Sequence, residues 1–207
     1  MAAKGNWHAQ AMFSGGGGKV FRTQTLLYSA PTFNPSTSKH ICAVVMFNPG
    51  SASPNGGQLN RLVCCNLDPT MHRITSWIEE AYGRAEKDIP AESHITIFNL
   101  YNHVSPNLQA ALADVLSEGS KLSREPIDFK DLGQPLFVWQ AWGVRSERVV
   151  VEKIAESEAK IRSSGLPVVG NGDRLLRSYH PSYLNRNNGG RKNLLIDQIE
   201  RILSSRA

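Results

Sequence analysis

Long apolar runs and amphipathic runs take turns along most of the chain. Continuous apolar runs rich in β-branched and aromatic residues are typical of strands that are covered on both faces. They occupy residues 41–47, 94–101 and 135–143. Helical periodicity follows each of them, in residues 68–85, 107–122 and 148–165. A fourth strand with its loop is expected within "LLRSYHPSYL" (175–184), and a closing helix within "RKNLLIDQIERILSS" (191–205).

Four alternations of strand and helix predict an α/β fold. A crossover helix between successive strands makes those strands parallel. We therefore expect residues 41–207 to form a three-layer sandwich with a central, mainly parallel four-stranded sheet. Residues 1–40 are predicted to be an N-terminal extension with a β-hairpin that packs on this core.

The first amphipathic run carries clear signals of a helix. Asp68 is a favourable N-cap residue, and Pro69 fits the first helical turn. The apolar positions that follow have helical spacing and predict a buried stripe. They are Ile74, Trp77, Ile78 and Ala81.

Polar or glycine-containing segments interrupt or follow each expected strand. They are "NPGS" after residues 41–47, "NLYNH" in the second strand, "AWG" at the third and "HPS" in the fourth. The C-terminal ends of parallel strands meet at one edge of a sheet, where α/β proteins bind their ligands. The sequence therefore predicts a functional site at this edge.

Three residues of these segments are candidates, and each also has an ordinary structural interpretation. Asn48, beside Pro49 and Gly50, either forms an Asx-turn or holds a water or a substrate carbonyl. Asn99 interrupts an apolar strand, and it either pairs with nearby backbone or reads the edge of a base. His180 is either a loop histidine or a group that stabilises negative charge on a leaving group.

The charge of the chain agrees with a polyanionic partner. The formal net charge is +5 and the pI is about 9.2. Residues 173–192 hold five basic residues and a single acid, Asp173, which is either a solvated surface or a set of phosphate contacts. The chain has no apolar run of membrane-spanning length and no signal-peptide pattern, so we expect a cytoplasmic protein that does not enter a membrane. The three cysteines lack metal-ligand spacing, and we expect no metal and no cofactor.

In their order along the chain, these segments resemble motifs of the uracil-DNA glycosylase superfamily. "MFNPGSAS" resembles its first motif, above all the G-x-N-P-G form of the mismatch-specific branch, and "TIFNLYNHVS" resembles the strand whose Asn reads a flipped base. "PLFVWQAWG" resembles the third strand, and "SYHPSYL" resembles the second catalytic motif, H-P-S-x-L. With "LDPTMHRITSW", the set is also similar to a bacterial and phage domain family, a divergent branch that resembles antiphage glycosylases for modified bases.

The resemblance implies a catalytic role for some of these residues. Asn48 would orient the attacking water or stabilise the sugar cation, and His180 would hydrogen-bond the departing base. Asn99 would bind the extruded base, in a pocket that Phe47 and Gly50 would also line.

Other matching positions are expected to hold the DNA. Ser51 and Ser182 would grip phosphates, and Leu184 would fill the space that the flipped base leaves in the stack. The basic residues Arg186, Arg191 and Lys192 would contact the DNA backbone.

The chain also departs from the family pattern. Met46 stands where the first motif has glycine, and Gly50 replaces the tyrosine that excludes thymine in uracil-specific enzymes. A more open pocket and a larger or modified base are therefore expected. Asp68 is an additional residue that either only caps a helix or acts as a carboxylate in the cleft.

The resemblance thus implies a monofunctional DNA glycosylase, acting as a monomer on double-stranded DNA that contains a modified base. A hypermodified phage base such as glucosylated hydroxymethylcytosine is one expected target, and the product would be an abasic site, in antiphage defence or in DNA repair. Two alternatives remain open at this point: a catalytically silent nucleic-acid-binding module of the same fold, and a hydrolase of free modified nucleotides.

Overall fold

The computed structural model describes residues 6–16, 18–30, 33–34, 36–50, 59–105, 107–122, 134–143, 146–170, 180–181 and 190–206. Its strands are β1 (His8–Gly16), β2 (Lys19–Tyr28), β3 (Lys39–Met46), β4 (Leu62–Cys65), β5 (Ser93–Asn99), β6 (Phe137–Ala141) and β7 (Val168–Val169). Its helices are α1 (Pro69–Arg84), α2 (Leu108–Glu118), the short 3-10 helix η1 (Gly119–Leu122), α3 (Arg148–Ser163) and α5 (Gly190–Ser204).

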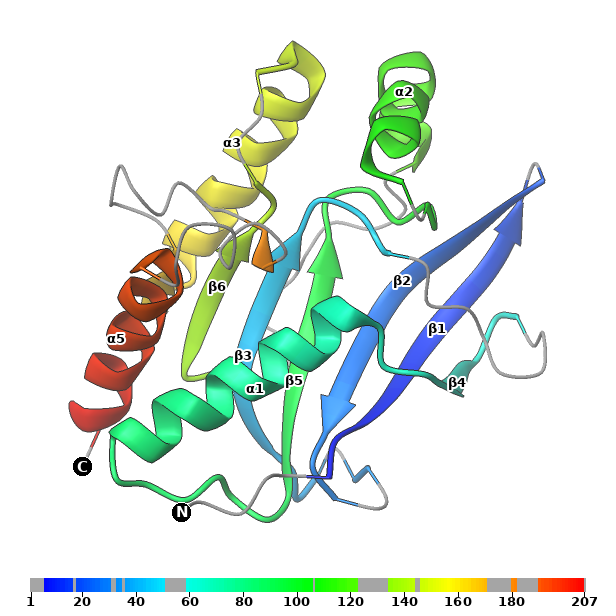
Figure 1. Cartoon of the computed structure of the whole chain (residues 1–207). Helices are drawn as coiled ribbons and strands as arrows, with labels where there is room; N and C mark the ends of the chain where they lie inside the picture. Colours follow the sequence, from blue (N-terminus) through cyan, green and yellow to red (C-terminus); the bar gives the residue numbers. More distant parts are fainter. Residues whose placement is uncertain are drawn as a thin grey trace.

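All the strands lie in one sheet, in the order β4-β1-β2-β5-β3-β6-β7 (Figure 1). β5, β3, β6 and β7 are parallel to one another, whereas β4, β1 and β2 extend the sheet beyond β5 in antiparallel pairings. The predicted α/β class is confirmed, but the predicted four-stranded sheet is wrong. The sheet is mixed and seven-stranded, because the N-terminal hairpin and the segment before α1 add three strands to one edge.

The sequence predicts a hairpin in residues 1–40, but the pairing of β1 and β4 within the same sheet is hard to see because their inward side chains are mostly small. β1 turns Ala9, Ala11 and Phe13 into the core, and two of these are alanines, which favour no strand. β4 has only four residues and buries Val63 and Cys65. A strand this short carries too little alternation to stand out from a loop.

Helices cover both faces of the sheet and bury two apolar cores (Figure 1). α1 and α5 pack on one face, called the α1 face below, where their side chains meet Val44, Ile97 and Trp139. α2 and α3 pack on the other, the α2 face, against Val45 and Val138. In the described ranges no helix is both long and apolar enough to cross a membrane.

The predicted helix boundaries agree closely with the structure. Asp68 caps α1, and the predicted stripe from Ile74 to Ala81 is buried. Gly165 follows α3 with a φ of +69°, a left-handed conformation that favours glycine just after a helix. The closing helix is confirmed as α5.

The described residues place a short strand directly after α3. Val168–Val169 is β-branched and pairs with β6, and most of the strand and loop predicted within 175–184 lies outside the described residues. Residues 171–179 and 182–189 lie outside the described residues. The segment before Asp68 supplies the edge strand β4, which pairs with β1.

Two histidines stack at the end of the sheet where β3 and β5 begin. The rings of His40 and His94 have centroids 4.4 Å apart and planes inclined by 15°. Ser38 Oγ lies 2.9 Å from His94 Nδ1, and the Phe33 ring packs against the His94 ring at 5.2 Å. Burial, and then the charge that His40 can carry, lowers the pKa of His94 to about 4.

This lowered pKa predicts a loss of stability in mild acid. Between about pH 6.5 and the lowered value, the unfolded chain binds a proton at His94 that the folded chain does not bind. The free energy of unfolding should therefore be level above about pH 6.5 and fall below it, with a loss of about 2 kcal/mol at about pH 5. Urea unfolding measures it, and His94→Asn should remove most of the pH dependence. The exposed His72→Asn is the matched control; an unchanged pH dependence in His94→Asn would contradict the assignment.

Candidate functional site

The ends of β3 and β5 bring the two candidate asparagines to one edge of the sheet. Met46, the last residue of β3, pairs with Asn99, the last residue of β5. The chain leaves β3 through Asn48, Pro49 and Gly50, and it leaves β5 towards Ser105. Both connections therefore start side by side at the C-terminal edge of the parallel strands, where the sequence predicts the site.

The amide of Asn48 ties these two connections together. Its Nδ2 donates hydrogen bonds to the carbonyl oxygens of Pro49, at 2.8 Å, and of Ser105, at 3.2 Å. The backbone N–H of Ser105 in turn donates to the Pro49 carbonyl at 3.4 Å. The amide NH2 group of Asn48 is thus used in hydrogen bonds that hold the two connections together. Only its acceptor, Oδ1, remains for a water or a ligand.

Asn99 is a buried amide whose polar atoms have no hydrogen bond. The residue is 3% exposed, and neither Nδ2 nor Oδ1 finds a partner within the described ranges. Its side chain lies on the α1 face, since it follows Ile95 and Ile97 at strand spacing. A buried polar group without a partner costs about 1–3 kcal/mol, and native proteins keep few of them. An amide of this kind, at the edge where α/β proteins bind ligands, is a candidate ligand-binding group.

Asp68 reaches the same edge from the start of α1. Its Oδ1 accepts hydrogen bonds from the backbone N–H groups of Thr70, at 2.8 Å, and Met71, at 2.9 Å, and so caps the helix. Its Oδ2 lies next to Gly50, where an added Cβ would be only 3.2 Å away. The missing side chain at Gly50 therefore leaves room for the Asp68 carboxylate. One carboxylate oxygen caps the helix while the other faces the turn that follows β3.

The structure adds one residue that the sequence does not single out. Arg22 on β2 is fully buried, and its Nε, Nη1 and Nη2 atoms have no hydrogen-bond partner in the part of the chain that the structure describes. It pairs across the sheet with Phe13, whose side chain belongs to the α1-face core. Thr25 pairs with Ile97 in an antiparallel ladder, so Arg22, three residues before Thr25, and Asn99, two residues after Ile97, both lie beyond this pair towards the same edge. The two unpartnered side chains therefore come from neighbouring strands and share one face.

A β-bulge explains how this arginine becomes buried. Met12 pairs with Gln24 and Phe13 pairs with Arg22, so Thr23 is an additional residue without a partner in β1. A bulge shifts the side-chain alternation of its strand by one residue. Read with strict alternation, the sequence places Arg22 on the opposite face from Thr25. The sequence pattern does not reveal this bulge, and so it does not place Arg22 among the candidate site residues.

The charges of Arg22 and Asp68 act on each other. Burial lowers the pKa of Arg22, and the negative charge of Asp68, followed by that of a Cys65 thiolate, opposes this shift. An arginine side chain keeps its proton even when it is buried. The edge thus holds a buried cation and a half-buried carboxylate that interact without a direct hydrogen bond.

The other predicted site residues are not all gathered here. Phe47 is buried in the α2-face core, where its ring packs on Tyr101 with centroids 5.4 Å apart, so it lies on the opposite side of the sheet from Asn99. His180 is half-buried and lies between two segments outside the described residues. Lys192 on α5 forms an ion pair with Glu80, with Nζ 2.6 Å from Oε2. Arg191 precedes Lys192 in the first turn of α5. Ser51, Ser182, Leu184 and Arg186 lie outside the described residues.

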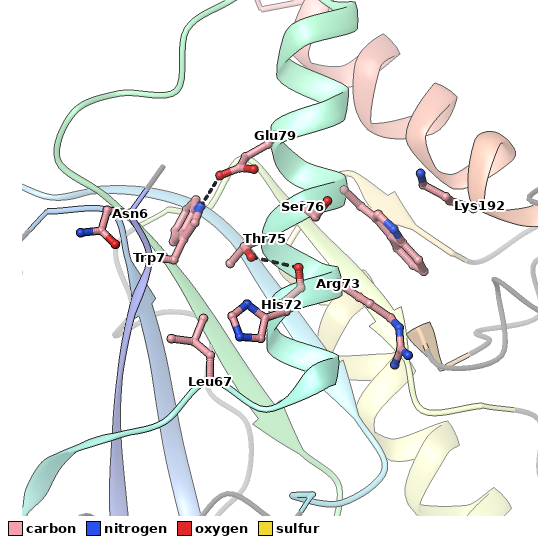
Figure 2. A pocket seen from close by; sticks show the side chains of 10 residues that line it. Asn6, Trp7, Leu67, His72, Arg73, Thr75, Ser76, Glu79 and Lys192 are labelled. Atoms are coloured by element: carbon pink, nitrogen blue, oxygen red, sulfur yellow. Dashed lines mark hydrogen bonds between the residues drawn. The ribbon is translucent and has the colours of Figure 1, made fainter. Parts of the chain in front are cut away.

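An open hollow of about 640 Å³ runs along the first half of α1 (Figure 2). Figure 2 shows Trp7 and His72 on one side of the helix, and Arg73 and Lys192 on the other. Trp7 Nε1 donates a hydrogen bond to Glu79 Oε1 at 2.8 Å, which fixes the indole against the helix. Leu67, the residue before Asp68, also lines the hollow, and the basic side chains of the hollow are of the kind that contact phosphates.

Over the described ranges, no group of three His, Cys, Asp or Glu side chains is arranged to hold a metal ion. Comparison of the chain with family models, with curated proteins and with solved structures finds no match. The chemistry of the site is therefore argued from its own residues. They supply a buried amide, a buried cation and a carboxylate at the C-terminal edge of a parallel sheet.

The electrostatic interaction between Asp68 and Arg22 can be measured through its effect on the free energy of unfolding. Asn caps a helix about as well as Asp, so Asp68→Asn keeps the cap and removes only the charge. We expect the free energy of unfolding to fall by about 1–2 kcal/mol, because a buried cation loses its compensating charge. In an Arg22→Met background the same change should cost less than about 0.5 kcal/mol. Urea unfolding of the four proteins gives the coupling, and equal costs in both backgrounds would show that the two charges do not interact.

Proposed function

We propose that the protein is a DNA glycosylase that extrudes a modified base from duplex DNA and hydrolyses its N-glycosidic bond, leaving an abasic site. The observation that carries this proposal is the buried, unpartnered amide of Asn99 at the C-terminal edge of β5. An Asn amide offers a donor and an acceptor side by side, and it can pair with a base edge through two hydrogen bonds. The resemblance of the motifs to glycosylases adds support, because it assigns base reading to the same residue.

The residues around Asn99 suit the hydrolytic step. The Asp68 oxygen beside Gly50 can accept a proton from a water or stabilise positive charge on the sugar. The remaining acceptor of Asn48 can orient that water. The Asn48 hydrogen bonds hold the turn in place, which keeps these acceptors aligned before a substrate binds.

A second candidate is a nucleic-acid-binding module of the same fold without catalysis. It is favoured by the commitment of the Asn48 amide group to the Pro49 and Ser105 carbonyls. In this alternative Asn48 only shapes the loop, and Asn99 only binds a base. The two candidates differ in one product, the abasic site.

The decisive test incubates the protein with duplexes that contain uracil, 5-hydroxymethylcytosine, its glucosylated form or 5-formylcytosine, and with phage DNA that carries modified bases. We expect abasic sites from at least one substrate, detected as strand breaks only after alkali, because the proposed enzyme has no lyase activity. DNA binding without abasic sites on any substrate would favour the binding module.

The role of Asn99 is tested by Asn99→Leu, which keeps the volume and removes the amide. We expect excision to fall roughly 10–100-fold, the range of one lost bidentate base contact. The free energy of unfolding should stay the same or rise, since the amide makes no hydrogen bond that the substitution would break. Single-turnover kinetics and urea unfolding measure the two effects.

Thr96→Val is the matched control for Asn99→Leu. Thr96 is another buried polar residue of β5 whose side-chain oxygen has no hydrogen-bond partner among the described residues, but its backbone pairs with Ala43 of the α2-face core. The substitution Thr96→Val should leave both the excision rate and the free energy of unfolding nearly unchanged. A loss of excision as large as that of Asn99→Leu would show that β5 acts through packing and not through the amide.

A further inference from the structure

The buried guanidinium of Arg22 lies outside every motif that links the chain to a function. It comes from β2 of the N-terminal hairpin, whereas the proposed base-reading and hydrolytic residues come from β3, β5 and the start of α1. Within the described ranges none of its three nitrogens has a hydrogen-bond partner, although a guanidinium is a fork of five N–H donors. A buried charge without hydrogen bonds is costly, so its retention on the same face of the sheet as Asn99 calls for a ligand with matching acceptors.

The donors of Arg22 and the amide of Asn99 face the same side of the sheet from adjacent strands. A guanidinium matches two neighbouring acceptors in one plane, such as a ring nitrogen next to a carbonyl oxygen. On the basis of the glycosylase function proposed above, we propose that Arg22 and Asn99 together bind the acceptor edge of the extruded base. We also propose that the positive charge of Arg22 stabilises the negative charge that the base gains as it leaves.

The charges of the site favour a neutral base in the ground state. The positive charge of Arg22 and the negative charge of Asp68 already compensate each other. A neutral base therefore adds no net charge to the buried site, whereas an anionic substituent would add one. Cytosine-type bases present N3 beside the O2 carbonyl, and guanine presents N7 beside O6. Adenine has no carbonyl oxygen, and uracil carries a proton on N3. The site should therefore prefer cytosine-type or guanine-type bases to adenine and uracil.

The same pair of charges matches the charge separation of the reaction. When the C1′–N bond breaks, its electron pair goes to the base nitrogen, and the sugar carbon becomes positive. Arg22 would then face the base anion, and Asp68 would face the sugar cation. The water oxygen bonds to C1′, and the proton that water releases passes through Asp68 to the base. The products are a neutral base and an abasic sugar, with no other reactant.

Excision kinetics test the charge role with Arg22→Gln and Arg22→Met, on duplexes that contain 5-hydroxymethylcytosine or 5-formylcytosine. The single-turnover rate should fall at least about 100-fold on 5-hydroxymethylcytosine, while the Kd for the duplex changes by less than about threefold. The loss should be several-fold smaller on 5-formylcytosine, because its electron-withdrawing group makes the base a better leaving group. Arg22→Lys should restore part of the rate. A wild-type rate in both variants, or the same loss on both bases, would overturn the charge role.

The control for these variants is Arg162→Gln. Arg162 lies in the last turn of α3, its side chain is 66% exposed, and its nearest acid is Glu158 at 3.7 Å. The substitution Arg162→Gln removes one positive charge from the protein, as Arg22→Gln does, but leaves the site unchanged. Excision should therefore stay within about twofold of wild type. A loss as large as that of Arg22→Gln would assign the effect to general attraction of DNA and overturn the proposal.

A binding measurement separates this pocket from the proposed function. Free cytosine, at millimolar concentration, should raise the melting temperature of the wild-type protein more than adenine and uracil do. The increase should be lost in Arg22→Met and in Asn99→Leu. If the wild-type protein makes no abasic sites but shows this pattern, the glycosylase function fails and the pocket stands. No increase with any base, or the same increase in wild type and Arg22→Met, would overturn the pocket.

Discussion

The parallel pairing of β3 with β5 determines where the candidate residues lie. Because Met46 stands opposite Asn99, the chain leaves both strands at the same level, and the two connections are close enough for Asn48 to bond to both. The first connection leads to α1, whose capping residue Asp68 comes back over Gly50. β2 pairs with the other side of β5 and carries Arg22 to this edge. A site built from four separate segments thus follows from strand register.

The apolar cores stabilise a fold that places buried polar groups at one edge of its sheet. Both faces of the sheet are covered by helices, and the strand residues that meet them are almost fully buried. Each large apolar side chain buried in this way contributes about 1.5–3 kcal/mol. Against this, Arg22 and Asn99 have buried polar atoms that form no hydrogen bond with any part of the chain that the structure describes. Groups that lower the stability of the free protein but match a ligand are common where proteins bind or react.

Much of the fold can be predicted from the sequence, but the composition of the site only in part. The helices have strong periodicity and clear end signals, such as Asp68 before α1 and Gly165 after α3, so their bounds are predictable. The candidates Asn48 and Asn99 stand out because they follow or end apolar strands, and Asp68 stands out as the cap of a predicted helix. The edge strand β4, the pairing of β2 with β5 and the place of Arg22 are hidden, because pairing partners and a bulge decide them and leave no local pattern.

The bulge at Thr23 links the burial of Arg22 to the packing of the opposite face. Leu27 lies in the α1-face core and Phe21 lies in the α2-face core, although strict alternation would put these two residues on the same face. Without the additional residue, Phe21 would point into the site and Arg22 would point into the apolar α2-face core. Burying a guanidinium among aliphatic side chains costs far more than burying it near a carboxylate. The packing of Phe21 therefore holds the bulge in place, and the same bulge directs Arg22 towards Asp68 and Asn99.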